Sequence, residues 1–323
     1  MSVEKVARGY KTTCLMDFET SFGVAPDVAA GKLLPINSFG LNVSRAKNSS
    51  ATLSGRRDPV EPYDGNTEVT GSLAVPVDAR AFPYWLKLLL GAPTSTGTGD
   101  PAAAPYTHVF KPGDEAPSAI IQSRYGTSTA TFGKFTGCKV SSIAMQAGGD
   151  GELTATVNVT GRDVDYSETD YNASAESVVM KRFSNFQASL KSDGVEVATV
   201  TDFSLTLDNG LDTSVRTIGS GGKLYDIPEG IMSVTGSMTA LFTSLVMLNK
   251  AKGNTELSLE LGWSIDEGNK LSFKLPEVQM QFQGPTVDGP TGVKAEYPFV
   301  AYFNDAADNA CIIVTVVNDV ASY

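Results

Sequence analysis

The fold of this chain can be worked out from one stretch that occurs twice, Val69-Thr70-Gly71-Ser72-Leu73. It recurs 165 positions later as Val234-Thr235-Gly236-Ser237-Met238. A second pair of segments lies upstream in the same order: residues 39–43 (FGLNV) match residues 203–207 (FSLTL), 164 positions apart. Because both order and spacing are kept, the sequence predicts a tandem duplication with a period of about half the chain.

The segments around these repeats alternate between apolar and polar residues, as half-buried strands do. In the first copy the alternating positions are Val69, Gly71, Leu73 and Val75, and later Leu153, Ala155, Val157 and Val159. In the second copy they are Leu257, Leu259, Leu261, Trp263 and Ile265, and then Val278, Met280 and Phe282. Alternation of this kind predicts antiparallel sheets with one packed face and one wet face.

Each copy also contains one short helical pattern. In the first copy one helical face carries Phe82, Trp85, Leu86 and Leu89, and Gly91 is a typical stop. In the second copy the corresponding face carries Leu241, Leu245 and Leu248, with Gly253 as the stop. We therefore expect a mainly β chain of two tandem β-sandwich or barrel-like domains, each with a flanking α-helix.

The repeat also predicts the domain boundaries. The first copy covers residues 1–165, a polar and acidic linker covers residues 166–180, and the second copy covers residues 181–323. Residues 92–118 of the first copy are rich in Pro, Gly, Ala and Thr, and their weak periodicity is typical of an exposed loop or arm.

The chain ends in a dense β-branched run. Such a run predicts a strand that is buried on both faces or is completed by a neighbouring molecule. Candidate assembly residues in it are therefore Cys311, Ile312, Ile313, Val314, Val316 and Val317.

Composition excludes several classes of function. The formal net charge of −11 argues against a protein that grips nucleic acid by its phosphates. No apolar run is long enough for a membrane span. The single histidine, His108, lies in the insertion without a triad signature, and the three cysteines are too scattered for a zinc site. We expect no catalytic residues, no metal and no cofactor, and we expect the thiols to be reduced.

The stretch Glu19-Thr20-Ser21-Phe22-Gly23-Val24-Ala25-Pro26 resembles the E-T-x-[FY]-G-x-A-P opening of phage tail tube proteins. The V-T-G-S-L strand and the P-Y-W-L-K-x-x-L-G helix follow in the order of that family. The similarity spans most of residues 10–165, and the internal repeat extends it into the second half. The resemblance implies a major tail protein of long-tailed, non-contractile phages, whose relatives stack as rings of six β-sandwich domains around a lumen.

What this resemblance implies is a structural virion protein, made in the host bacterial cytoplasm, that polymerises into a tube conducting DNA. A chain with two copies would form a homotrimeric ring that is a pseudo-hexamer. The implied partners are further copies of the chain, tail tip and tail terminator proteins, and a tape measure protein in the lumen. Double-stranded DNA would pass without specific binding, and no membrane partner is implied.

An acidic lumen would repel phosphate and leave DNA no place to stall. Lumen candidates in the first copy are Asp58, Glu61, Asp64 and Glu68, although the same residues fit an ordinary acidic surface that aids solubility. We expect the insertion at residues 92–118 to make contacts between rings. A second reading is a glycan- or cell-surface-binding β-sandwich module of a baseplate or fibre, which would expose aromatic side chains on a concave face.

Overall fold

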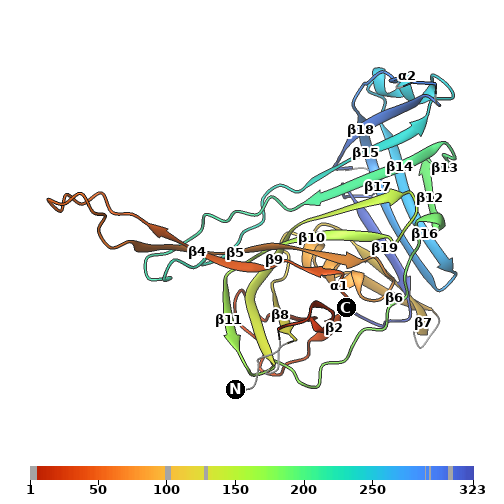
Figure 1. The fold of residues 1–323 in the computed structure, drawn as a ribbon. Coiled ribbons are helices and arrows are strands. Elements are labelled where there is room, and N and C mark those ends of the chain that lie inside the picture. The colour runs from red at the N-terminus through yellow and green to blue at the C-terminus, as the bar shows by residue number, and fades with distance from the viewer. Residues whose placement is uncertain (1–5, 99–102, 127–129, 288, 291, 305–307) are drawn as a thin grey trace.

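The computed structural model describes residues 6–98, 103–126, 130–287, 289–290, 292–304 and 308–323 (Figure 1). The fold is mainly β, with 51% strand and 7% helix, which confirms the predicted class. The first elements are η1 (Gly9–Lys11), β1 (Thr13–Phe18), β2 (Lys32–Leu34), β3 (Ser38–Phe39), β4 (Asn42–Asn48), β5 (Tyr63–Pro76), α1 (Phe82–Leu90), β6 (Thr94–Thr98), β7 (Ala103–Phe110), β8 (Ala119–Tyr125), β9 (Thr131–Gly148), β10 (Thr154–Gly161) and β11 (Asp163–Ser167). The remaining elements are η2 (Asn185–Gln187), β12 (Ala188–Ser192), β13 (Val195–Glu196), β14 (Val200–Asp208), β15 (Ser233–Leu241), α2 (Val246–Lys252), β16 (Leu257–Asp266), β17 (Asn269–Met280), β18 (Lys294–Tyr302) and β19 (Ile313–Asn318).

The same order of antiparallel strand pairings occurs in the two halves of the chain. In the N-terminal half the pairs are β1–β2, β1–β8, β8–β9, β9–β10, β10–β5, β5–β4 and β9–β11. Their counterparts in the C-terminal half are β12–β13, β12–β16, β16–β17, β17–β18, β18–β15, β15–β14 and β17–β19. A duplication predicts this correspondence of strand pairings. The domain boundaries at residues 165 and 180 stay predictions.

The repeated glycines of β5 and β15 are explained by close backbone approaches. A Cβ atom at Gly71 would lie 2.2 Å from the carbonyl oxygen of Gly40. A Cβ atom at Gly236 would lie 2.2 Å from the carbonyl oxygen of Ser204. In both halves a preceding stretch of backbone, Gly40 before β4 and Ser204 in β14, therefore lies close to this position, and only glycine leaves room for it.

The two helices differ strongly in burial. In α1 seven of the nine residues are buried, and the helix ends at Gly91, whose φ of 98° suits glycine. In α2 only Ala251 is buried, and the helix ends at Gly253 as predicted. The prediction for Leu241 was wrong: this residue is the last of β15, because it pairs with Lys294 of β18.

Glu19, the first residue of the E-T-S-F-G stretch, ties three segments together. Its carboxylate accepts hydrogen bonds from the Gly23 N–H at 2.7 Å, the Ser118 hydroxyl at 2.6 Å and the Gly137 N–H at 2.8 Å. Both glycines have positive φ, 73° and 61°. The stretch therefore joins the end of β1 to Ser118, just before β8, and to Gly137 in β9, and its role here is structural.

Within residues 92–118 the structure describes two paired strands, β6 and β7, rather than the irregular loop that the composition indicates. β6 pairs with β7, and β7 pairs with β19 of the C-terminal half through residues such as Phe110 and Val314. The other edge of β19 pairs with β17. The insertion is thus part of the contact between the two halves of one chain.

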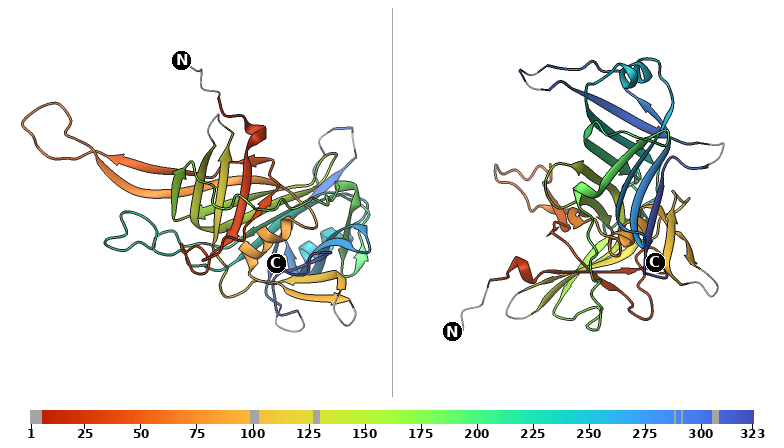
Figure 2. Two further views of the ribbon diagram at one scale, coloured as in Figure 1. Left: turned by 90° about the horizontal axis from the view of Figure 1, so that it is seen from below. Right: turned by 90° about the vertical axis from the view of Figure 1, so that its right-hand side faces the viewer.

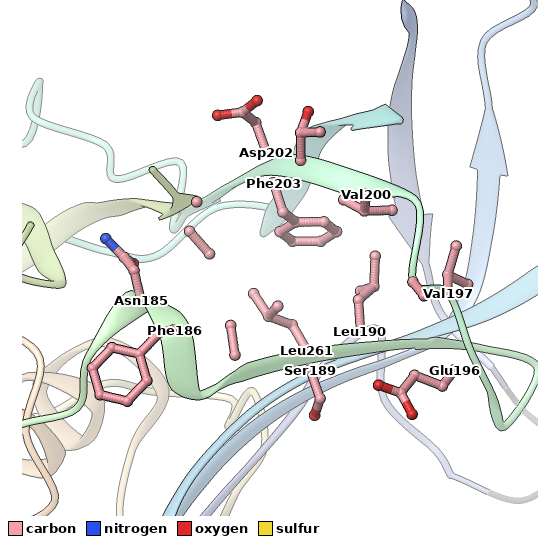
Figure 3. Close-up of a pocket in the computed structure, with 15 residues that line it drawn as sticks. Asn185, Phe186, Ser189, Leu190, Glu196, Val197, Val200, Asp202, Phe203 and Leu261 are labelled. Atoms are coloured by element: carbon pink, nitrogen blue, oxygen red, sulfur yellow. The ribbon is translucent and has the colours of Figure 1, made fainter. Parts of the chain in front are cut away.

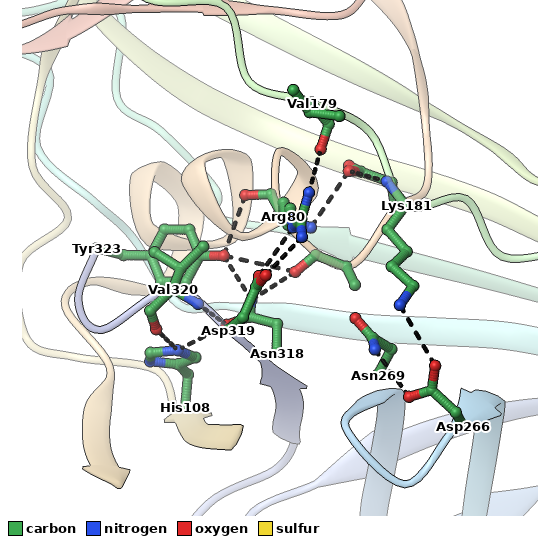
Figure 4. Close-up of polar contacts among 12 residues, drawn as sticks. Arg80, His108, Val179, Lys181, Asp266, Asn269, Asn318, Asp319, Val320 and Tyr323 are labelled. Carbon is green, nitrogen blue, oxygen red and sulfur yellow. Dashed lines mark hydrogen bonds and ion pairs between the residues drawn. The ribbon is translucent and has the colours of Figure 1, made fainter. Parts of the chain in front are cut away.

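His108 of β7 is fully buried, contrary to its expected place in an exposed insertion. Its ring contacts the Ser95 hydroxyl at 2.7 Å. It also contacts the Val320 carbonyl oxygen at 2.8 Å (Figure 4). Nearby, Arg80 binds both carboxylate oxygens of Asp319 at 2.8 and 2.5 Å. The Tyr323 hydroxyl donates to the Arg80 carbonyl at 3.0 Å. The C-terminal residues therefore lie between β7 of the insertion and the start of α1 and are hydrogen-bonded to both.

Candidate assembly interface

Strand β9 joins the two halves into one sheet. Its first part, from Thr131 to Cys138, pairs with β8 and β11. Its second part pairs with β10 on one edge and, from Ser142 to Gly148, with β14 on the other. A continuous sheet therefore runs in the order β4–β5–β10–β9–β14–β15–β18 (Figure 1). Within one chain, the strands of the two halves are thus joined edge to edge.

One face of this continuous sheet is the core and the other is polar. One row across six strands is buried: Leu73, Val157, Ile143, Leu207, Val234 and Ala301. The neighbouring row on the opposite face is Ser72, Asn158, Ser142, Asp208 and Ser233. We call this second side the polar face. Such a one-sided sheet presents a largely polar surface, interrupted at β18 by the exposed Val300, which pairs with Thr235.

Carboxylates are spread over the polar face. The ladder register places Glu68 beside Ser44, and Asp202, Thr239 and Glu296 in one row. Lys139 also belongs to this region, but it is buried and its ammonium lies 2.7 Å from Glu229. One exposed cation, Lys294, lies two residues from Glu296 on the same face of β18. The field of the polar face is therefore set by its acids, by this lysine and by neutral hydroxyl and amide groups.

The structure brings only Glu68 of the four lumen candidates onto the polar face. Asp58 and Glu61 belong to residues 49–62, the exposed tip of an arm formed by β4 and β5 that projects from the body (Figure 2). Asp64 lies at the end of the β4–β5 ladder next to this tip, where its ion pair with Lys47 lowers the pKa of its carboxyl. Sequence reasoning missed Asp202, Asp208 and Glu296, because only the strand register shows which face they share.

One edge of β4 has no partner within the described residues, although the matching strand β14 is paired on both edges. The Val43 N–H donates to its neighbour's side chain, Asn42 Oδ1, at 2.8 Å. This amide therefore points away from β5 and is satisfied locally. β4 is an open edge of the kind that can pair with another chain.

A complementary open edge follows β17. Met280 in β17 corresponds to Val140 in β9. Met280 pairs with Phe299, which pairs with the repeated glycine Gly236. In the same way, Val140 pairs with Val159, which pairs with the repeated glycine Gly71. The part of β9 beyond Val140 pairs with β14 on its outer edge. Residues 281–287 contact β18 through the Gln281 N–H and the Thr286–Lys294 bridge, and their other edge has no strand partner within the described residues. Phe282 in this segment is 53% exposed and Val287 is 70% exposed.

The C-terminal run lies inside the molecule. β19 is flanked by β17 and β7, and Ile312, Val314 and Val316 are buried. Both edges of this strand are thus used within the chain, and neither is open to a neighbour. An assembly role for Cys311, Ile312, Ile313, Val314, Val316 and Val317 stays a prediction.

Three observations bear on chemistry. Within the described residues no group of His, Cys, Asp and Glu could hold a metal ion. No helix in the same part of the chain is long and apolar enough to cross a membrane. All three cysteines are free, and burial raises the pKa of the Cys14 thiol to about 12, which keeps it protonated and unreactive at neutral pH.

Comparison with known proteins adds one match. A family model described as phage tail tube protein matches residues 9–301, nearly the whole chain. The comparison with curated proteins gives no match.

Proposed function

This chain belongs to the phage tail tube protein family, and on that premise we propose that it polymerises into stacked rings forming the tail tube, a channel for DNA passage into the host. Family membership makes it a structural protein of the phage tail. The observation that carries the proposal is the β9–β14 pairing. It joins equivalent sheets edge to edge within the chain while β4 and the segment after β17 stay open.

The ring is proposed to be a homotrimer that is a pseudo-hexamer. If the two halves are copies of one unit, the junction between them repeats between chains, with residues 281–287 of one chain beside β4 of the next. Each chain has one of each open edge, so the contact is head-to-tail and closes into a ring when the rotation fits. Six equivalent units per ring then need three chains.

The polar face is proposed to line the lumen. Its hydroxyl and amide rows offer DNA weak contacts that water replaces easily, and its carboxylates repel phosphate. The chain would then act without catalysis or cofactor. Its partners would be copies of itself, tail tip and tail terminator proteins, and a tape measure protein in the lumen, all in the virion after synthesis in the host cytoplasm.

Reversing charge on the polar face should slow DNA release while tubes still form. The variant Glu68→Lys with Glu296→Lys places cations on an exposed part of this face, where they attract phosphate. The matched control is Asp58→Lys with Glu61→Lys, which makes the same charge change on the arm tip. DNA release from virions is measured by dye fluorescence. An unchanged rate for the first variant would count against the polar face as lumen.

Electron microscopy of the purified protein tests the proposed function directly. We expect negatively stained samples to show tubes or stacked rings of uniform bore, with three chains per ring by mass. A monodisperse monomer that binds glycan would contradict the proposal. It would instead support the alternative of a glycan- or cell-surface-binding module of a baseplate or fibre.

A further inference from the structure

The segment before β12 is a strand partner for β2 of the N-terminal half. The Leu33 N–H donates to the Glu176 carbonyl at 2.9 Å, and the Val178 N–H donates to the Leu33 carbonyl at 3.0 Å. Lys32 and Glu176 also form an ion pair of 2.7 Å. We call residues 176–183 the linker strand. It leads into η2 and β12, and it crosses the N-terminal half on the way.

The linker strand makes a second set of bonds just before α1. The Ala79 N–H donates to the Lys181 carbonyl at 2.9 Å, and the Phe183 N–H donates to the Val77 carbonyl at 3.2 Å. The Asp78 carboxylate accepts a bond from the Lys181 N–H at 3.4 Å. The linker strand therefore runs across the N-terminal half from β2 to the residues after β5. We call the strip of backbone that it covers, Leu33 and residues 77–79, the track.

The C-terminal half contains the same track. The Phe242 N–H donates to the Val293 carbonyl at 2.9 Å, as the Val77 N–H donates to the Leu153 carbonyl at 2.9 Å. Phe242 thus takes the place of Val77. Its neighbour Leu241 donates to the Thr199 carbonyl at 2.9 Å, which brings the residues after β13 next to it.

No segment fills this second track within the described residues, and apolar side chains along it are open. Val195 of β13 is 69% exposed, and Leu245 and Val246 at the start of α2 are 58% and 61% exposed. By contrast, the corresponding residue before α1, Ala81, is buried at 2%. The missing cover explains part of the difference in burial between the two helices.

A groove lies at the β13 end of the open track (Figure 3). Its volume is about 390 Å³, and its lining includes Leu190, Val197, Phe203 and Leu261. Phe186 at the groove is 86% exposed. The matching groove of the N-terminal half is lined partly by the linker strand itself, through Ser177, Val178, Met180 and Arg182. The groove at β13, which we call the open groove, therefore lacks the side that the linker strand supplies in the N-terminal half.

The segment that corresponds to the linker strand is the one before β1. The turn η1 precedes β1 as η2 precedes β12. Arg8 lies five residues before Thr13, and Arg182 lies six residues before Ala188. Within this segment Val6 is 85% exposed, so its apolar side chain lacks cover. The turn η1, at the end of this segment, lies on the N-terminal half and away from β12 and β13 (Figure 2).

The charges of residues 1–12 and of the open groove are opposite. Residues 1–12 contain Lys5, Arg8 and Lys11 against one acid, Glu4, in a chain whose net charge is −11. The open groove is lined by two carboxylates, Glu196 and Asp202. A basic segment is therefore attracted to this groove.

We propose that residues 1–12 of a neighbouring copy dock on the open track between β13 and the start of α2, as the linker strand docks within the chain. The neighbour's backbone adds a strand to the edge near Ala198, its apolar residues cover Val195 and Leu245, and its cations meet Glu196 and Asp202. This docking rests on the proposed ring, and it locks each chain to the next at a second place besides the sheet junction.

A disulfide tests the docking in assembled tubes. In a Cys311→Ser background, Val6→Cys combined with Val197→Cys should form interchain disulfides on mild oxidation, seen as dimers and trimers on denaturing gels. Val28→Cys, at a site that is 78% exposed, replaces Val6→Cys in the control pair and should give at least tenfold less crosslink. Tubes that show no crosslink above the control would overturn the docking but leave the ring intact.

Peptide binding tests the docking of residues 1–12 in the absence of tubes. A labelled peptide of residues 1–12 should bind the full-length monomer, followed by fluorescence anisotropy in low salt. Glu196→Lys with Asp202→Lys should weaken binding at least tenfold, whereas Glu267→Lys, on an exposed turn, should not. Equal binding by all three proteins, or none by the wild type, would overturn the docking. A wild-type protein that binds the peptide but never forms tubes would contradict the proposed function alone.

Discussion

A proline at position 43 should leave the subunit folded and abolish tube formation. Val43 belongs to β4, and its N–H points to the open edge, where Asn42 Oδ1 accepts it at 2.8 Å. In the matching strand, Leu207 faces Ile143 of β9 across the junction between the halves. A neighbouring chain would meet Val43 in the same way. Proline removes this outward N–H while the bonds from β4 to β5 remain, and edge strands tolerate it.

The expected effect of Val43→Pro is large because every junction in the tube contains the substitution. Losing the bond leaves the neighbour's carbonyl without a partner and costs about 1–3 kcal/mol, which weakens each junction about 5- to 150-fold. Sedimentation and electron microscopy measure assembly, and thermal unfolding by circular dichroism measures folding. Val43→Ala is the matched control, since it keeps the N–H and should still form tubes. Tubes from the proline variant with an unchanged critical concentration would show that β4 is not the contact edge.

Removing residues 311–323 should unfold the subunit. From the sequence alone the run reads as an assembly strand, so its deletion would be expected to leave a folded chain that does not polymerise. In the structure Ile312 and Val314 are 0% exposed and Val316 is 1% exposed. Burying three such side chains contributes roughly 5–9 kcal/mol, which is comparable to the whole stability of an ordinary domain. The deletion also leaves β17 and β7 without their shared partner.

Circular dichroism melts and the yield of soluble protein measure this effect. A pair of point variants gives a finer test. Val314→Ala removes a buried side chain and should lower the unfolding free energy by about 2–4 kcal/mol, whereas Ile313→Ala, on the less buried side of β19, should lower it less. A truncated chain that stays soluble and melts like the wild type would favour the interpretation of the run as an assembly strand.

Local patterns in the sequence were sufficient to predict strands and helices such as β16 and α1. Alternation at Leu257–Asp266 predicted β16, and the apolar face that ends at Gly91 predicted α1, because side-chain periodicity follows directly from strand and helix geometry. The repeat of Val69–Leu73 predicted that strand pairings would occur twice. The pattern failed at Leu241, where the same apolar spacing suits a helix face and a strand end.

The partners of those elements were decided only by the tertiary structure. The β-branched run after Cys311 could equally pair within the chain or with a neighbour, and its place between β7 and β17 settles the pairing. The carboxylates of the polar face could not be chosen from sequence, and three of the four lumen candidates lie on the arm instead. The sequence by itself determined which side of each strand is apolar, because that depends on side chains. Which strand lies next, and so which edges stay open, depends on backbone N–H and C=O groups that nearly every residue shares, so it emerges only when the whole chain is folded.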